Sequence, residues 1–178
     1  MDRKSLIRLA TPADEAILWQ MLMYAAHESS LDVVKANPDL ARYVQNFGRA
    51  GDIGLIAEAA QHQAIGAAWL RLWTADDKGY GYVSDEIPEL AIAVHPNHRG
   101  KGIGTQLLTE LIEHTSTQFP AISLSIRADN PALKLYERIG FTPVPGSKVV
   151  NREGGVSFNM LYATSQPLET QCGERAGR

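Results

Sequence analysis

Hydrophobic and polar residues follow two different periods along this chain. In some segments apolar residues recur every three or four positions, as on one face of a helix, and in others they alternate or form short runs, as in strands. This pattern predicts helices that begin near residues 11–12, 38, 103 and 130, and strands at 6–9, 52–59, 63–73, 89–94, 122–127, 141–150 and 156–162. Residues 27–36 have a mixed pattern, and we expect them to be irregular.

The order of these elements predicts one mixed α/β (α+β) domain with a largely antiparallel sheet. The strand–helix–strand unit from Leu90 to Ile126 is the one place where a parallel crossover is expected. A chain of 178 residues suits a single domain, which we place at residues 1–164. Residues 165–178 are polar and are expected to form a frayed tail.

Composition narrows the class of protein. Hydrophobic residues make up 44% and charged residues 21%, which is typical of a globular domain rather than a disordered chain. The net charge of −3 argues against a general polyanion binder, so we expect no nucleic-acid partner. A single cysteine, Cys172, excludes an intrachain disulfide and a cysteine metal cluster. Without a long apolar run or a secretory leader, we expect a cytoplasmic protein with no membrane partner and no metal.

The segment from Val94 to Thr105 carries the clearest chemical pattern. A predicted strand ends there, three glycines follow within five residues, and a helix begins. Exposed backbone N–H groups at a helix N-terminus, together with Arg99 and Lys101, are how proteins bind a pyrophosphate. The alternative is a glycine turn with solvated charges. The spacing fits neither a P-loop, which needs a lysine before Thr105, nor a Rossmann turn.

Two motifs in the sequence resemble those of the GNAT (Gcn5-related N-acetyltransferase) superfamily. The first is Arg99-x-x-Gly102-x-Gly104 after a strand, and the second runs from Asn130-Pro131-Ala132 to Gly140-Phe141. The resemblance covers about residues 6–162. It implies the GNAT acyl-CoA N-acyltransferase fold: a mostly antiparallel mixed sheet, one central parallel strand pair and about four flanking helices. Family members often dimerise, so the resemblance leaves a homodimer open.

The resemblance also implies acetyl-CoA as the cosubstrate and assigns residues to it. The backbone of Ile92, Ala93 and Val94 pairs with the pantetheine arm, Asn130 contacts it, and Tyr136 points at the thioester sulfur. The pyrophosphate lies on the turn formed by Arg99, Gly100, Lys101, Gly102, Ile103, Gly104 and Thr105. From the pattern alone, Asn130 would be a helix cap and Tyr136 a core tyrosine.

An amine must lose a proton before it attacks a thioester, so a base is required. Glu89 is our candidate, because it begins the strand at 89–94 whose backbone is expected to bind the pantetheine arm. Asp85, Glu86 and His95 are rival candidates. The alternative for Glu89 is a solvated carboxylate at the edge of the site with no catalytic role.

Trp69, Arg71 and Trp73 share one strand face, where we expect sheet packing and a solvated arginine. The expected acceptor pocket consists of Tyr24, Glu28, Tyr80, Tyr82 and Glu86.

The sequence therefore predicts an N-acetyltransferase that transfers acetyl from acetyl-CoA to a primary amine by direct attack in a ternary complex. No cysteine lies in the motifs, so no acyl-enzyme is expected. The acidic residues Asp85, Glu86 and Glu89 beside Tyr80 and Tyr82 favour a small cationic amine as acceptor. Two alternatives stay open: transfer to protein N-termini or lysines, and a non-catalytic acyl-CoA-binding module.

Overall fold

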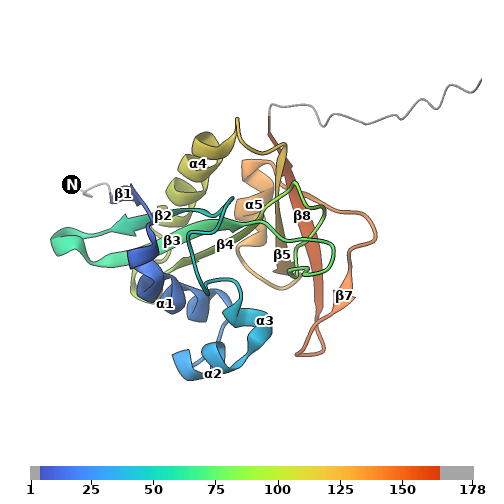
Figure 1. The fold of residues 1–178 in the computed structure, drawn as a ribbon, viewed down its shortest axis with the longest axis horizontal. Helices are drawn as coiled ribbons and strands as arrows, with labels where there is room; N and C mark the ends of the chain where they lie inside the picture. Colours follow the sequence, from blue (N-terminus) through green and yellow to red (C-terminus); the bar gives the residue numbers. More distant parts are fainter. Residues whose placement is uncertain (1–4, 165–178) are drawn as a thin grey trace, which may run out of the picture.

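A mixed eight-stranded sheet forms the centre of the computed structural model, which describes residues 5–164 (Figure 1). The strand order is β1-β2-β3-β4-β5-β8-β6, with β7 paired to β8. The strands are β1 (Leu6–Leu9), β2 (Ile53–Glu58), β3 (Ala64–Arg71), β4 (Glu89–Val94), β5 (Ala121–Arg127), β6 (Thr142–Pro143), β7 (Val149–Val150) and β8 (Val156–Ala163). The predicted fold class is confirmed, because among the strands of residues 5–164 only the β4–β5 pair is parallel. The predicted tail at 165–178 lies outside the described residues.

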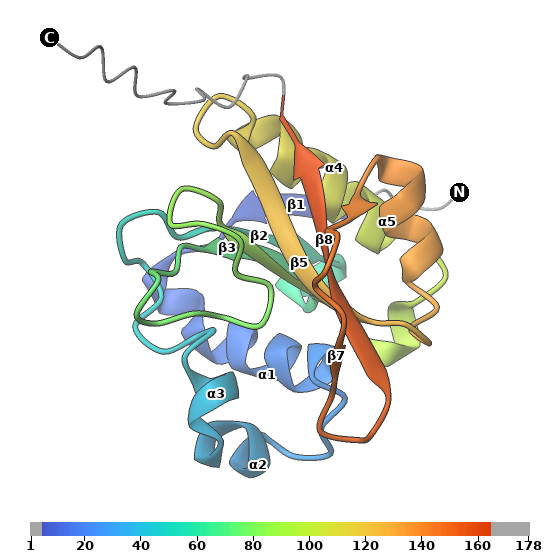
Figure 2. The same cartoon turned by 90° about the vertical axis from the view of Figure 1, so that its right-hand side faces the viewer.

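Helices cover both faces of the sheet (Figure 2). They are α1 (Glu15–Ala25), α2 (Leu31–Ala36), α3 (Pro38–Ala41), α4 (Ile103–Thr115) and α5 (Leu133–Ile139), with 3-10 turns at Pro12–Asp14, Ala60–His62 and Pro96–His98. Side chains of α4 and α5 pack with Ala68 and Leu70 of β3 in one core, and those of α1–α3 pack with Ala67 and Trp69 in the other. Successive side chains of a strand point to opposite faces, so β3 serves both cores.

The region between α1 and β2 differs from its prediction. Residues 27–36 are not irregular throughout, because α2 begins at Leu31, where the Ser30 side chain accepts a hydrogen bond from the N–H of Val33 (3.3 Å). A short helix with a side-chain cap gives too few apolar positions for a visible period. The helix predicted from Pro38 ends at Ala41 instead of continuing to Phe47. The predicted apolar side chains are still buried: Leu40 within α3, and Tyr43, Val44 and Phe47 in the turns that follow.

Two further predictions need correction. The single strand expected over 141–150 is two short strands, β6 and β7, separated by a turn that includes Gly146 at φ +76°. Arg71 is not solvated: its side chain is 1% exposed and forms an ion pair with the equally buried Asp52 (2.7 Å). Strand alternation predicted the face of Arg71 correctly, but the partner on that face lies in a distant part of the chain.

The parallel pair β4–β5 positions the functional site. The two strands are paired only at Glu89 and Ser123, near the start of each strand. Beyond that point the two strands are no longer paired with each other, although β4 stays paired to β3 and β5 stays paired to β8 along their lengths. The sheet is therefore open between the carboxyl ends of β4 and β5.

Candidate active site

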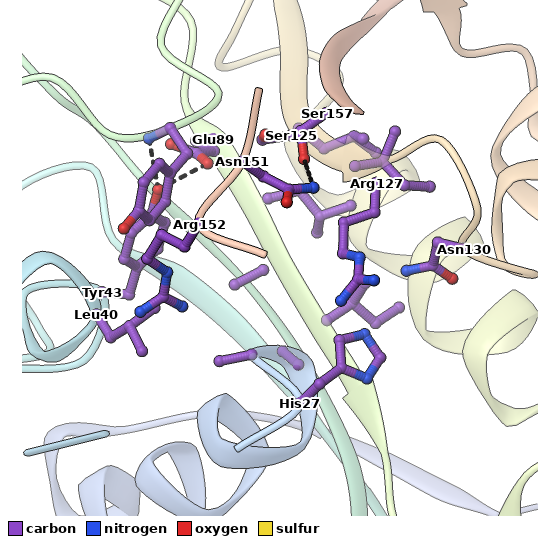
Figure 3. A pocket seen from close by; sticks show the side chains of 18 of the residues that line it. His27, Leu40, Tyr43, Glu89, Ser125, Arg127, Asn130, Asn151, Arg152 and Ser157 are labelled. Atoms are coloured by element: carbon purple, nitrogen blue, oxygen red, sulfur yellow. Dashed lines mark hydrogen bonds between the residues drawn. The ribbon is translucent and has the colours of Figure 1, made fainter. Parts of the chain in front are cut away.

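A cavity of about 360 Å³ lies along the opening between β4 and β5 (Figure 3). Both strands line it, together with the end of α1, residues of α3 and the turn after it, α5, and the segment that joins β7 to β8. The lining residues are Leu22, Ala25, Ala26, His27, Leu40, Tyr43, Tyr80, Glu89, Leu90, Ala91, Ile92, Leu124, Ser125, Ile126, Arg127, Asn130, Tyr136, Val149, Val150, Asn151, Arg152, Glu153 and Ser157. The opening thus exposes one edge of β4 to a chamber that a ligand can enter.

The glycine turn between β4 and α4 has the predicted geometry. Gly100 and Gly102 have φ of +74° and +79°, and a Cβ atom on either would meet no atom within 4 Å. The first hydrogen bond of the helix runs from the N–H of Gln106 to Gly102 (3.0 Å), so the N–H groups of Ile103, Gly104 and Thr105 have no acceptor within the helix. An open backbone with free donors at a helix N-terminus fits a pyrophosphate.

The other predicted acetyl-CoA residues lie around the same turn and opening. Arg99 Nε donates to the Val94 carbonyl (3.1 Å), which folds the turn back against the end of β4. Ile92 lines the cavity, whereas Ala93 and Val94 do not. Lys101 is exposed on the turn. The glycine turn therefore directly follows the strand whose residue Ile92 lines the cavity, an order of residues that fits an acyl-CoA molecule.

Tyr136 and Asn130 close the cavity on the α5 side. Asn130 Oδ1 accepts a hydrogen bond from the N–H of Ala132 (2.9 Å), so Asn130 caps the start of this helical segment. Asn130 also lines the cavity. Tyr136 is 9% exposed and its ring packs edge-on against Phe141, with the ring centroids 5.7 Å apart. Burial raises the pKa of Tyr136 to about 12. Its hydroxyl has no hydrogen bond with any residue among 5–164, which leaves it available to a ligand.

Glu89 also lines the cavity and is 4% exposed. Its Oε1 accepts a hydrogen bond from the hydroxyl of Tyr43 (2.8 Å), and its Oε2 accepts one from Nε1 of Trp73 (2.8 Å). The pKa of Glu89 rises to about 7, because burial disfavours the charged carboxylate more than the hydrogen bonds from Tyr43, Gly81 and Trp73 favour it. A carboxylate with a pKa near neutrality is suited to general-base chemistry.

The loop before β4 packs directly on this carboxylate. A Cβ atom on Gly79 would lie 2.2 Å from Glu89 Oε2, and one on Gly81 would lie 2.8 Å from Oε1. Both glycines are therefore required by close approach rather than by a special φ. The loop therefore covers both carboxylate oxygens of Glu89 from solvent.

The predicted acceptor residues are only partly brought together. Tyr80 lines the cavity and stacks on Tyr43, with the ring centroids 6.1 Å apart. Tyr24 packs against His95 instead, and Tyr82 donates its hydroxyl hydrogen bond to Asp85 (2.6 Å). Glu28 pairs with Arg152 (3.6 Å) at the cavity edge, and Glu86 is exposed. Neither Asp85, Glu86 nor His95 lines the cavity, so of the four candidate bases only Glu89 does.

Several cavity residues were not singled out as site residues from the sequence. Tyr43 looked like a core residue on a helix face, and it is one, but its hydroxyl also reaches Glu89. Arg127 lines the cavity while its guanidinium contacts Asp129 (3.2 Å) and Glu153 (2.5 Å). Arg152 enters from the hairpin that joins β7 to β8 (Figure 3). No local motif marks these residues, because their positions depend on long-range packing.

Two negative findings concern the described residues alone. Within 5–164 there is no group of three or more His, Cys, Asp or Glu side chains that could hold a metal ion. None of the helices in that range is long and apolar enough to cross a bilayer.

The fold and the site together define an acyl-CoA-dependent transferase, and comparison with known proteins agrees. Residues 50–143 match the family described as "Acetyltransferase (GNAT) domain", a range that includes Glu89, the glycine turn, Asn130 and Tyr136. This match covers more than half of the chain. The chain therefore belongs to the GNAT acetyltransferase family, and the predicted family and enzyme class are confirmed.

Solved structures share the fold over nearly the whole chain. The protein yncA from Salmonella typhimurium, solved with acetyl-CoA, is 21% identical; the match covers 96% of this chain and 99% of that one, with a TM-score of 0.71. A phosphinothricin acetyltransferase from Sinorhizobium meliloti, in complex with acetyl-CoA, is 20% identical over 94% of this chain and 95% of its own, with a TM-score of 0.69. A ribosomal-protein-alanine N-acetyltransferase from Brucella melitensis is 25% identical over 89% of this chain and 99% of its own, with a TM-score of 0.66.

The sequence match to one curated relative covers only a small part of that protein. The tRNA(Met) cytidine acetyltransferase TmcA of Saccharolobus islandicus is 35% identical over 78 residues, which is 43% of this chain. The match spans only 10% of that protein. The named acceptors of these relatives differ widely, so the comparisons leave the acceptor of this chain undetermined.

Proposed function

We propose that this protein is an acetyl-CoA-dependent N-acetyltransferase that acts on a primary amine by direct attack in a ternary complex. The observation that carries the proposal is that Glu89, at the start of β4, and Tyr136, on α5, line the same cavity in the β4–β5 opening. A base and an acid that line one chamber suit an amine that enters there and a thiolate that leaves.

The residues of this chain have distinct roles in this proposal. When bound, acetyl-CoA supplies the acetyl thioester and a thiolate leaving group. The turn from Arg99 to Thr105 holds the pyrophosphate, and the free edge of β4 near Ile92 holds the arm and offers backbone N–H donors to the developing oxyanion. Glu89 takes the proton of the amine, and the Tyr136 hydroxyl donates a hydrogen bond or a proton to the thiolate.

For the acceptor we propose a small amine rather than a peptide. A peptide needs an open groove, whereas this cavity is lined both by residues Val149–Glu153 of the hairpin and by Leu22, Ala25, Ala26 and His27 at the end of α1. The stacked rings of Tyr43 and Tyr80 beside the Glu89 carboxylate support recognition of an ammonium group by cation–π and charge attraction. Asp85 and Glu86 do not line the cavity, so any contribution of theirs to a cationic acceptor is long-range steering.

The test is an acetylation assay that follows CoA release with a panel of acceptors. The panel contains polyamines, amino acids, other small primary amines, peptides with free N-termini and peptides with lysine. We expect turnover with a small primary amine and none with matched peptides. Turnover restricted to peptides would overturn the small-acceptor proposal, and acetyl-CoA binding without turnover on any amine would favour the non-catalytic module.

Ionic strength separates steering from local recognition. A cationic acceptor that is steered by the acidic loop should show a kcat/KM that falls as salt is raised, because screening shortens the field to about 8 Å near physiological ionic strength. A neutral acceptor should show little change. If the best acceptor proves to be anionic or neutral, the proposal of a cationic amine is wrong even if the transferase activity stands.

A further inference from the structure

We propose that Tyr43 is a proton-transferring residue of this reaction: its hydroxyl passes the proton of the acceptor amine to Glu89. The inference rests on the proposed function, in which Glu89 is the base. Neither the family motifs nor the spacing of residues near β4 points to Tyr43, which lies in the turn after α3, 46 positions before Glu89. It stands on the hydrogen-bond geometry of a small buried cluster that faces the cavity (Figure 3).

The hydrogen bonds of Tyr43 orient its hydroxyl. The oxygen accepts a hydrogen bond from the backbone N–H of Tyr80 (2.7 Å), and the O–H donates to Glu89 Oε1 (2.8 Å). A phenol has one proton to donate and two lone pairs. With its proton directed at Glu89 and one lone pair occupied by Tyr80, one lone pair is left, and Tyr43 lines the cavity. The arrangement can accept one proton as it gives another away.

The Glu89 carboxylate is less accessible from other directions. Trp73 Nε1 donates a hydrogen bond to Oε2, and the loop at Gly79 and Gly81 lies against both carboxylate oxygens. The guanidinium of Arg42, which stacks over the Trp73 ring at 4.8 Å, is the charged group that acts on both Glu89 and Tyr43. A proton from the cavity therefore reaches the carboxylate most directly through the Tyr43 hydroxyl.

Buried contacts hold Tyr43 in place, which a relay requires. The Tyr43 carbonyl accepts a hydrogen bond from Trp69 Nε1 (2.9 Å). Arg71 donates to the carbonyls of Arg42 (2.5 Å) and Gln45 (2.9 Å), on either side of Tyr43. Arg71 is itself held by Asp52 through two hydrogen bonds of 3.0 and 2.7 Å. The non-helical turn that carries Tyr43 is thus fixed to β3 by side chains, and Arg71 and Asp52 are positioning residues.

The proton balance of the step is simple. The amine gives one proton to Tyr43 Oη while the original Tyr43 proton moves to Glu89 Oε1, so the tyrosine ends unchanged and Glu89 ends as a carboxylic acid. The two transfers must be concerted. Burial and the nearby Glu89 raise the pKa of Tyr43 well above its ordinary value, so a free tyrosinate is not an intermediate.

The test compares Tyr43→Phe with wild type in single-turnover acetyl transfer at saturating acetyl-CoA, across pH 5–9. The control is Tyr162→Phe, which removes a hydroxyl outside the cavity. If Tyr43 relays the proton, Tyr43→Phe loses about 10²–10⁴-fold of the rate on the high-pH plateau. If Glu89 takes the proton directly, the plateau stays within a factor of two, and the acidic limb moves to higher pH because Glu89 has lost a hydrogen bond that favours its charge. That second result would overturn the relay.

A proton inventory on the wild-type protein is independent of how the variant folds. In mixtures of H2O and D2O the single-turnover rate should fall as the deuterium fraction rises, along a curve that bows below a straight line, because two protons are in flight. A linear fall, which a single proton in flight gives, would overturn the relay. Glu89→Gln separates the two proposals. If Glu89→Gln keeps the full rate and pH profile, the base assignment itself is wrong; if it loses the acidic limb while Tyr43→Phe keeps the plateau, only the relay is wrong.

Discussion

The hydroxyl of Tyr43 lies 2.8 Å from Oε1 of Glu89 and donates a hydrogen bond to it. Tyr43 lies in the turn after α3, which packs on one face of the sheet. Glu89 is the first residue of β4, a central strand of that sheet. The contact connects the packing of the α1–α3 region with the ionisation of a carboxylate in the cavity.

Glu89 should make the protein less stable as pH rises. Its pKa is about 7 in the folded protein and 4.5 as the reference, so between these values the folded state binds more protons than the unfolded state, and the free energy of unfolding falls with rising pH. The loss is on the order of 3 kcal/mol. Glu89→Gln should remove it. Urea unfolding at pH 4.5 and pH 8 should show a smaller pH-dependent loss for Glu89→Gln than for wild type.

A suitable control for that experiment is Glu86→Gln, which neutralises an exposed carboxylate three positions away. Its pH dependence should follow that of wild type. Equal pH dependence of Glu89→Gln and wild type would mean that Glu89 is ionised as freely in the folded protein as in the unfolded one.

Tyr136→Phe should lower kcat and leave the affinity for acetyl-CoA almost unchanged. The ring packing on Phe141 is retained, and the hydroxyl makes no hydrogen bond within 5–164, so stability should change by less than about 1 kcal/mol. We expect a loss near the low end of about 10²–10⁴-fold, because a thiolate is already a fair leaving group. Steady-state kinetics and calorimetry measure the two effects; wild-type turnover would assign Tyr136 to the core alone.

Gly104→Val should weaken acetyl-CoA binding without unfolding the protein. A Cβ atom at Gly104 would make ordinary contacts of 3.7 Å with Leu135 and Val94, so the helix tolerates a side chain, but it would crowd the N-terminus of α4 where the pyrophosphate is expected. Wild type should gain about 2.7 kcal/mol of stability at 100 times the Kd of acetyl-CoA. The variant should lose most of this gain in a thermal-shift titration.

A control that changes a glycine away from this turn is Gly146→Ala. Gly146 has φ +76° and open space around it, and it lies in the turn between β6 and β7. Its variant should lose stability through backbone strain and keep its acetyl-CoA affinity. Unchanged affinity in a folded Gly104→Val variant would exclude the turn as the pyrophosphate site.

Breaking the buried ion pair should be costly. The side chains of Arg71 and Asp52 are each 1% exposed, so Arg71→Met leaves a buried carboxylate without its partner and should destabilise the fold by about 3–5 kcal/mol. The exposed pair between Arg42 and Asp77 (2.5 Å) offers a comparison, since Asp77→Asn should cost no more than about 1 kcal/mol. Urea unfolding of both variants tests this, and similar costs at the two sites would contradict the burial argument.

The sequence by itself determined the features that depend on local pattern. The glycine turn, its left-handed residues and the helix that follows are written in adjacent residues, because only glycine adopts φ near +79° without strain and a helix N-terminus begins where apolar spacing begins. The hairpin of β2 and β3, the amphipathic helix α4 and the single parallel crossover were likewise predictable from periodicity and order. The two motifs then sufficed to indicate the family.

Only the tertiary structure decided which side chains share the cavity. Glu89 was selected from the sequence by its place at the start of a strand, but its burial, its contacts with Tyr43 and Trp73, and its pKa come from three segments that meet in space. Arg71 looked like a solvated residue, because its partner Asp52 lies 19 positions earlier in the sequence, just before β2. Local periodicity reports which face a side chain takes; it holds no information about the residue from a distant segment that faces it.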